Sequence, residues 1–292
     1  MIILLFISIN MTNFRMIFLY LIKISKNMEL KLLILSFVIL IIFGAFENAS
    51  ATSEPILITI SPSMENIIFD GKWTNVLEWK QSSHNLLTFD DGEITVHLRT
   101  AHFGDYIYIF VDSVSDLTLD EKKDEATICL DGKNNKNKVH DSDDFCFSIL
   151  LGNNEGSIFQ GNSIDGSVAS MQKISNPDDF IAISTVSDEN DRYTTTPHPS
   201  YEFKIPIELL NRSDNYGFHL SVFDASSNEY YSWPENSTRI SSSDFPNPST
   251  WGDIISPDKS LPELNLPIMI FTILLFTIIL LQVKGKTRIL HQ

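Results

Sequence analysis

The stretch DYIYIFVD at residues 105–112, followed by DEATICLD at residues 124–131, decides the fold of this chain. Both stretches are rich in β-branched and aromatic residues and begin and end with an acidic residue. Short runs of this composition, separated by turn residues, are typical of β-strands. Upstream, residues 94–100 (ITVHLRT) alternate apolar and polar side chains, which indicates a strand with one buried face.

The same pattern recurs along the middle of the chain. Strands are expected at residues 94–100, 106–111, 126–130, 145–151, 180–186, 201–205 and 216–223, with Asp, Asn, Gly and Ser clusters between them. Only residues 206–211 look helical, and no alternation of strands and helices suggests a parallel α/β sheet. These features predict an all-β fold, an antiparallel β-sandwich of the immunoglobulin or jelly-roll type.

The start of the chain predicts export. Residues 28–51 begin with Met-Glu-Leu-Lys, continue as an apolar run and end with Ala49-Ser50-Ala51, the order of a secretory signal peptide. Residues 1–27 contain two earlier apolar runs. They are either a gene-model extension ahead of a start at Met28 or an extra hydrophobic segment. Residues 1–51 are therefore left out of the fold prediction.

The end of the chain predicts a membrane anchor. After a spacer at residues 257–265, the apolar residues 266–283 are long enough to span a bilayer. The basic tail at residues 284–292 favours the cytoplasmic side, so residues 52–256 should lie outside the cell membrane as a single-pass protein. A second interpretation remains open. The order of Leu-Pro-Glu-Leu (261–264), apolar helix and basic end is similar to sorting signals of the archaeosortase and exosortase type, whose helix is cleaved.

Charge limits the partners of the domain at residues 52–256. The whole chain carries a formal charge of −16, and the two ends hold a relatively large share of its basic residues. An acidic domain repels nucleic acids and anionic lipid surfaces, so no nucleic-acid partner is expected. Clustered carboxylates suit a divalent cation instead, because Ca²⁺ prefers oxygen ligands.

The two cysteines, Cys129 and Cys146, each lie in a short apolar run, with a polar loop between the runs. This arrangement predicts a hairpin. Outside the cytoplasm the pair can form a cross-strand disulfide. The alternative is two buried thiols that never meet. A zinc site is not expected, because the chain has no CxxC or HxxxH spacing.

Several motifs, taken in order, resemble the domains of carbohydrate-binding module family 9. They are IFDGKW at residues 68–73 with EW at 78–79, the two stretches quoted first, DDFCF at 143–147, YEFKIP at 201–206 and PSTWGDI at 248–254. The family usually has Trp after the YEFKIP-like segment, where this chain has Ile207. The resemblance implies a β-sandwich at residues 52–256 that binds a glycan or cell-envelope polysaccharide. It also implies an association with polysaccharide catabolism.

Aromatic side chains are the candidates for sugar contact, because their faces pack against the apolar faces of pyranose rings. Trp233 follows a tyrosine pair near a polar loop and is the favoured platform, with Tyr231 beside it and Trp73 next. Trp79 and Trp251 lie in framework motifs and are expected in the core, where most Trp side chains are buried.

The loop between the cysteines is the candidate calcium site. Asp131, Asn135, Asp141 and Asp143 place carboxylate and amide oxygens at short intervals, as a Ca²⁺ loop does. The pattern is not an EF-hand, because Lys133 occupies a ligand position and no Glu closes the loop. The resemblance favours calcium, since these modules often carry it. A solvated hairpin loop is the alternative.

Catalysis has little support, because the chain has no GxSxG, HExxH or P-loop motif. The expected protein is therefore a non-catalytic, surface-held binding module with Ca²⁺ as the one candidate cofactor and no organic cofactor. One rival is a structural or adhesion protein without a sugar site. Another is a DOMON-type electron-transfer sandwich, with haem held by Met64 or Met171 and a histidine. Asn211 and Asn236 begin N-glycosylation sequons.

Overall fold

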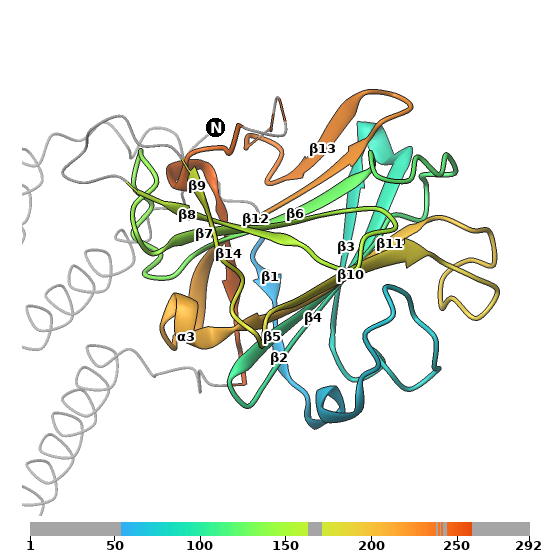
Figure 1. Cartoon of the computed structure of the whole chain (residues 1–292), viewed down its shortest axis with the longest axis horizontal. Coiled ribbons are helices and arrows are strands. Elements are labelled where there is room, and N and C mark those ends of the chain that lie inside the picture. The colour runs from blue at the N-terminus through green and yellow to red at the C-terminus, as the bar shows by residue number, and fades with distance from the viewer. Residues whose placement is uncertain (1–53, 163–170, 238, 240, 242–243, 259–292) are drawn as a thin grey trace, which may run out of the picture. The chain divides into compact units, whose positions relative to one another are not determined.

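The computed structural model describes residues 54–162, 171–237, 239, 241 and 244–258 (Figure 1). The predicted signal peptide at residues 28–51 and the predicted membrane helix at residues 266–283 lie outside this part. Within it, no helix has the length and apolar character needed to span a bilayer.

The described residues form two β-sheets that face one another (Figure 1). The first sheet has β12 at its centre, which pairs with β6 along one side and with both β13 and β14 along the other. In order across the sheet, the strands are β1 (Ile56–Leu57), β14 (Gly252–Ile255), β12 (Asn215–Asp224), β6 (Glu125–Asp131), β7 (Asp144–Leu150), β8 (Ser157–Gly161) and β9 (Met171–Ile174), with β13 (Glu229–Trp233) beside β12.

The second sheet is built around the pair β4 and β5. Its strands are β10 (Ile181–Val186), β11 (Pro199–Pro206), β5 (Tyr106–Asp112), β4 (Ile94–Phe103), β2 (Thr59–Ile60) and, also paired with β4, β3 (Ser83–Phe89). The helical elements are short: α3 (Ile207–Leu210), η2 (Pro62–Asn66), η3 (Asp90–Gly92) and η4 (Pro248–Thr250). All seven predicted strands are present. The predicted all-β sandwich is confirmed. Its sheets are mixed, since two short pairs depart from the antiparallel pattern: β1 runs parallel to β14 and β2 parallel to β4.

The main core lies between the sheets because strand residues alternate between two faces. Ala126, Ile128 and Leu130 of β6 point inward and are 0% exposed, and they meet inward residues of β5 such as Ile109 and Val111, also 0% exposed. The intervening residues of β6 point to the outer face of the first sheet. This alternation decides which side chains are available to a ligand there.

A second cluster covers the outer face of the second sheet. The segment that leads into β3 lays Trp73 and Trp79 over Phe110 of β5. Glu202 of β11 fixes this segment: one carboxylate oxygen accepts the Trp79 indole N–H at 2.9 Å and the other accepts the Gly71 amide at 2.8 Å. The IFDGKW and EW motifs are therefore in direct contact with the YEFKIP motif.

Cys129 of β6 and Cys146 of β7 are directly opposite in the register, and their sulfurs are bonded at 2.01 Å. The predicted cross-strand disulfide is thus present in the structure. Both residues are 0% exposed, under Trp251 and Phe245 on the outer face of the first sheet.

Removing this disulfide is expected to lower stability substantially. Cross-linking residues 17 apart removes about 3 kcal/mol of unfolded-chain entropy, which corresponds to a fall in Tm of roughly 6–12 °C for a domain of this size. Differential scanning calorimetry of the Cys129→Ala/Cys146→Ala variant against the wild type measures the effect. Equal melting of the two proteins under oxidising conditions would contradict it.

The stability of the domain is also expected to fall in acid through His219. This residue of β12 is 0% exposed and stacks near Trp251. Burial, with a contribution from the Arg239 charge, lowers the pKa of His219 to about 3. Because the unfolded chain takes up this proton near pH 6.5, stability from His219 is complete above pH 6.5 and is lost progressively below it.

The expected result is that His219→Gln has a shallower decline of Tm between pH 6.5 and pH 4.5 than the wild type. The comparison with His219→Gln is needed because buried acids change the stability in the opposite direction as the pH falls. Burial raises the pKa of Glu202, for example, to about 8. Thermal melts of both proteins at matched pH values supply the measurement. If Tm declined equally in both proteins between pH 6.5 and pH 4.5, His219 would not be the cause of the loss of stability in acid.

Candidate functional site

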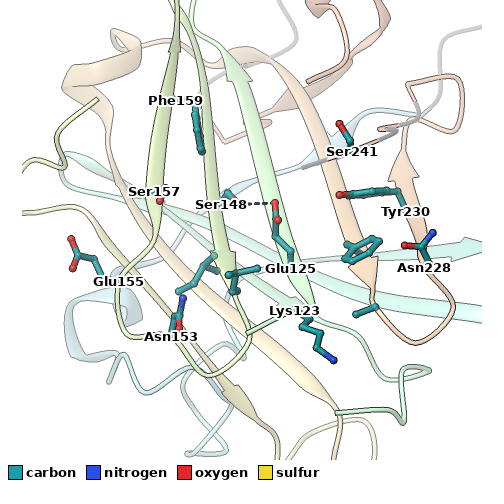
Figure 2. Close-up of a pocket in the computed structure, with 14 residues that line it drawn as sticks. Lys123, Glu125, Ser148, Asn153, Glu155, Ser157, Phe159, Asn228, Tyr230 and Ser241 are labelled. Atoms are coloured by element: carbon teal, nitrogen blue, oxygen red, sulfur yellow. Dashed lines mark hydrogen bonds between the residues drawn. The ribbon is translucent and has the colours of Figure 1, made fainter. Parts of the chain in front are cut away.

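A groove of about 830 Å³ lies on the outer face of the first sheet. Figure 2 shows Glu125 and Ser148 at its floor, with Tyr230 and Asn228 on one side and Asn153 and Glu155 on the other. The remaining lining side chains come from these and neighbouring strands and loops: Lys123, Ile149, Leu150, Ser157, Phe159, Phe223, Ala225 and Ser241.

The floor of the groove is built on a buried ion pair. The carboxylate of Glu125 accepts a hydrogen bond from the Arg239 guanidinium at 2.7 Å, and their side chains are 9% and 1% exposed. The same oxygen of Glu125 also accepts the hydroxyls of Thr127 and Ser148, each at 2.7 Å. Because Arg239 neutralises Glu125 and these hydroxyls orient it, the floor is polar and fixed in place.

Aromatic rings form the walls. Tyr230 of β13 lies opposite Phe223 of β12 in the register, with ring centroids 4.5 Å apart. Phe159 of β8 packs on Phe245 with centroids 5.0 Å apart. The Arg239 guanidinium lies 5.4 Å from the centre of Tyr230 and 4.7 Å from that of Phe245. A single buried cation therefore supports the aromatic side chains at both walls as well as the floor.

The direction of each side chain on β13 follows from strand alternation, and it decides which of them line the groove. Tyr231 and Trp233 point inward and pack against the main core, while Tyr230 points outward into the groove. Trp233 also lies over Gly252, where a Cβ would come within 2.3 Å of its ring. Trp233 lines neither this groove nor the neighbouring hollow. The role of Trp233 as a sugar platform therefore stays a prediction, and Tyr230 is the β13 side chain that lines the groove.

Trp73 is also a core residue. It is 1% exposed, and it packs edge-on against Phe110 and Tyr193 with its indole N–H donated to the Asn75 carbonyl. No face of the ring is open to a sugar, so the predicted role of Trp73 is corrected. Trp79 and Trp251 are buried, as expected.

Tyr231 keeps access to solvent at a second hollow next to the groove. This hollow, of about 310 Å³, is lined by Phe89, Asp90, Asp91, Tyr230, Tyr231, Ser232 and Glu235. Tyr230 lines both hollows. Of the three predicted sugar-contacting residues, Tyr231 is thus the one that lies beside the candidate site.

The predicted calcium loop forms a carboxylate cluster with a different membership. Asp131, Asp143 and Asp144 each place an oxygen within 4.8 Å of the others. Asn135 and Asp141 instead bond to one another at 3.1 Å, and Lys133 pairs with Asp143 at 2.6 Å. Asp144, which the prediction omitted, is 0% exposed and its Oδ1 has no hydrogen-bond partner. Burial and the neighbouring carboxylates raise the pKa of Asp144 to about 8.

The remaining predicted positions are placed as follows. Asn211 and Asn236 are exposed, so both sequons have accessible asparagines. Met64, one of the two methionines considered as haem ligands, is 1% exposed within the cluster around Trp73 and Trp79.

The domain is similar in structure to two solved forms of a family 9 carbohydrate-binding module from Caldicellulosiruptor kristjanssonii. The form in complex with cellotriose is 15% identical over 72% of this chain and 98% of that one, with a TM-score of 0.44. The form in complex with glucose is 14% identical over 73% and 100% of the two chains, with a TM-score of 0.45.

A carbohydrate-binding protein described as putative, from Bacteroides uniformis, is 11% identical over 69% of this chain and 99% of that one, with a TM-score of 0.40. No protein-family model matches the sequence, and neither does any curated protein.

Proposed function

We propose that this domain is a non-catalytic glycan-binding module and that the glycan lies in the groove on the outer face of the first sheet. The observation that carries the proposal is the combination of aromatic walls, Tyr230 and Phe159, with a fixed polar floor at Glu125. Pyranose rings present apolar C–H faces and a rim of hydroxyls, which match these two kinds of surface. A concave site with a few convergent polar groups is the usual form of a ligand pocket.

The charges around the groove favour an uncharged sugar. Arg239 already compensates Glu125, which leaves Lys123 and Glu155 as opposite charges on the exposed lining. The adjoining hollow adds Asp90 and Asp91 without a basic residue, and the chain as a whole is acidic. A polyanionic glycan would be repelled. We therefore infer a neutral oligosaccharide or cell-envelope polysaccharide as the ligand.

A glycan array probed with the full-length chain tests the proposal. The expected result is saturable binding to neutral oligosaccharides. A blank array obtained with protein shown to be folded by near-UV circular dichroism would overturn it and favour a structural or adhesion role.

We also propose that the cluster of Asp131, Asp143 and Asp144 binds Ca²⁺. The support is the unpartnered Oδ1 of the buried Asp144, beside two further carboxylates and with oxygen donors only. Removal of calcium with a chelator is expected to lower Tm, because a ligand selective for the folded state stabilises it. Asp144→Asn should lose one bound Ca²⁺ per chain by elemental analysis; an unchanged calcium content would contradict the assignment.

The proposed cellular setting rests on the sequence. The predicted signal peptide and the predicted helix at residues 266–283 would place the module at the cell surface, tethered to the membrane. In that position the module would hold a glycan near the cell rather than cleave it.

A further inference from the structure

The hollow beside the glycan groove differs from the groove in charge. It has a volume of about 310 Å³, and Tyr230 lines both. The other described residues that line it are Phe89, Asp90, Asp91, Tyr231, Ser232 and Glu235, which include three carboxylates and no lysine, arginine or histidine. We call it the acidic hollow. The groove, in contrast, contains Lys123 and a Glu125 carboxylate that Arg239 neutralises.

The acidic hollow is open because β13 has a neighbouring strand on one side only. β13 pairs with β12, and no other strand of the described residues pairs with it. The short turn η3, which follows Phe89, supplies the wall with Asp90 and Asp91. These two residues have φ values of 50° and 54°, a left-handed conformation that Asp and Asn adopt more readily than most residues. The turn thus places two adjacent, exposed carboxylates at the hollow.

The charges of this turn favour a cationic ligand. Within the described ranges, neither Asp90 nor Asp91 forms an ion pair. Burial chiefly, and the charges of Glu229 and Asp90 in part, raise the pKa of Tyr231, which places Asp90 near this phenol. The rings of Phe89 and Tyr231, with centroids 6.0 Å apart, form the apolar side of the hollow. Carboxylates and aromatic rings both attract a cation.

We propose that the acidic hollow binds a primary ammonium group and that, under the proposed function, this group belongs to an amino sugar of the bound glycan. A primary ammonium has three N–H donors, which suit the carboxylates of Asp90 and Asp91. A quaternary ammonium has no N–H to donate. An inorganic cation would leave the aromatic side of the hollow without a contact.

Tyr230 connects the ammonium site to the glycan groove, because it lines both hollows. A glycan in the groove that extends past Tyr230 would place its next sugar in the acidic hollow. Neutral oligosaccharides therefore bind through the groove, and a glycan that carries an amino sugar at this position binds more tightly. This selectivity rests on the proposed function, whereas the ammonium site itself does not.

Two trimers of β-1,4-linked sugars, one of glucose and one of glucosamine, test the selectivity by calorimetric titration of the full-length chain. They differ only in whether each ring carries a hydroxyl or an ammonium. The wild type is expected to bind the glucosamine trimer roughly five- to tenfold more tightly, as exposed charge pairs beside an aromatic ring allow. Asp90→Asn/Asp91→Asn should lose this preference, because asparagine keeps the left-handed backbone but carries no charge.

Asp178→Asn/Asp179→Asn is the matched control. These two aspartates are also adjacent in the sequence, and they line neither hollow. Since both double variants lose the same charge, any general attraction of the acidic chain for a cationic sugar falls equally in both. The control is expected to keep the preference for the glucosamine trimer. An equal preference in the two double variants would overturn the proposed selectivity.

Saturation-transfer NMR with n-propylammonium tests the ammonium site without any glycan. A signal is expected with the wild type and with Asp178→Asn/Asp179→Asn, but not with Asp90→Asn/Asp91→Asn. Choline should give a weaker signal, because its nitrogen carries no proton. If neither trimer bound but this pattern held, the glycan groove would be contradicted and the ammonium site supported. Equal propylammonium signals in the two double variants, or a choline signal as strong as that of propylammonium, would overturn the ammonium site.

Discussion

Replacing Tyr230 with alanine is expected to weaken glycan binding about thirtyfold or more while the domain stays folded. Tyr230 lines both hollows and forms one wall of the groove, so its ring is placed to contact a sugar in either of them. Truncation of a central aromatic contact residue typically costs about 2 kcal/mol or more of binding free energy. Its loss removes one cross-strand aromatic pair, with Phe223, but nothing from the main core.

Tyr106→Ala is the matched control. Tyr106 is a half-buried tyrosine on β5 of the other sheet, where Lys204 lies 3.8 Å from its ring centre, and it lines none of the hollows described above. Calorimetric titration of the oligosaccharide selected on the array compares the two variants. If Tyr230→Ala bound the oligosaccharide with the affinity of the wild type, the proposal that the glycan lies in this groove would be contradicted.

Arg239→Met is expected to destabilise the domain by about 3–5 kcal/mol, because it leaves the Glu125 carboxylate buried without its counter-ion. For a domain of about this size, the corresponding fall in Tm is on the order of 10 °C. The variant also loses the cation that lies against Tyr230 and Phe245, so the groove should bind glycan poorly even below Tm.

Two further variants test whether the loss of stability in Arg239→Met comes from the unpaired charge of Glu125. Arg239→Met combined with Glu125→Gln should recover part of the lost stability, since no buried charge then remains unpaired. Arg212→Met is the surface control: Arg212 pairs with Asp105, and both side chains are more than half exposed, so little change in Tm is expected. A fall in Tm as small for Arg239→Met as for Arg212→Met would contradict the buried-pair interpretation.

Strand positions were largely predictable because hydrophobic alternation is a local property. The pattern at residues 94–100 and the two apolar runs around Cys129 and Cys146 predicted β4, β6 and β7 and brought the cysteines together. The short strands β1, β2 and β14 were not predicted. They are two to four residues long, and their parallel pairings join distant parts of the chain.

The candidate site was less predictable because it depends on which face of a strand is outward. In the run Tyr230-Tyr231-Ser232-Trp233, the sequence offers an aromatic residue on each face. The prediction favoured Trp233 for its position near a polar loop; in the structure Trp233 packs partly buried against the main core, and Tyr230 lines the groove. Alternate residues of β13 point to opposite faces of the sheet, so knowing that one of them is buried would have shown which of the others point outward.

Arg239 could not be found from local pattern at all. It lies outside any strand, and its importance comes from a partner, Glu125, that is 114 residues away. In the same way, Asp144 becomes a candidate cation ligand only through neighbours that the fold supplies. Acidic residues are abundant in this chain, so sequence spacing alone did not single it out.

The most direct test of the central claim is to locate a bound glycan on the full-length chain by photo-cross-linking. A diazirine-bearing form of the array-selected oligosaccharide is irradiated with the protein, and the labelled peptides are identified by mass spectrometry. Labels are expected on the segment of Asn228 and Tyr230, at the start of β13, and on the loop that contains Asn153 and Glu155. Labels confined to the outer face of the second sheet, around Tyr106 and Lys204, would contradict it.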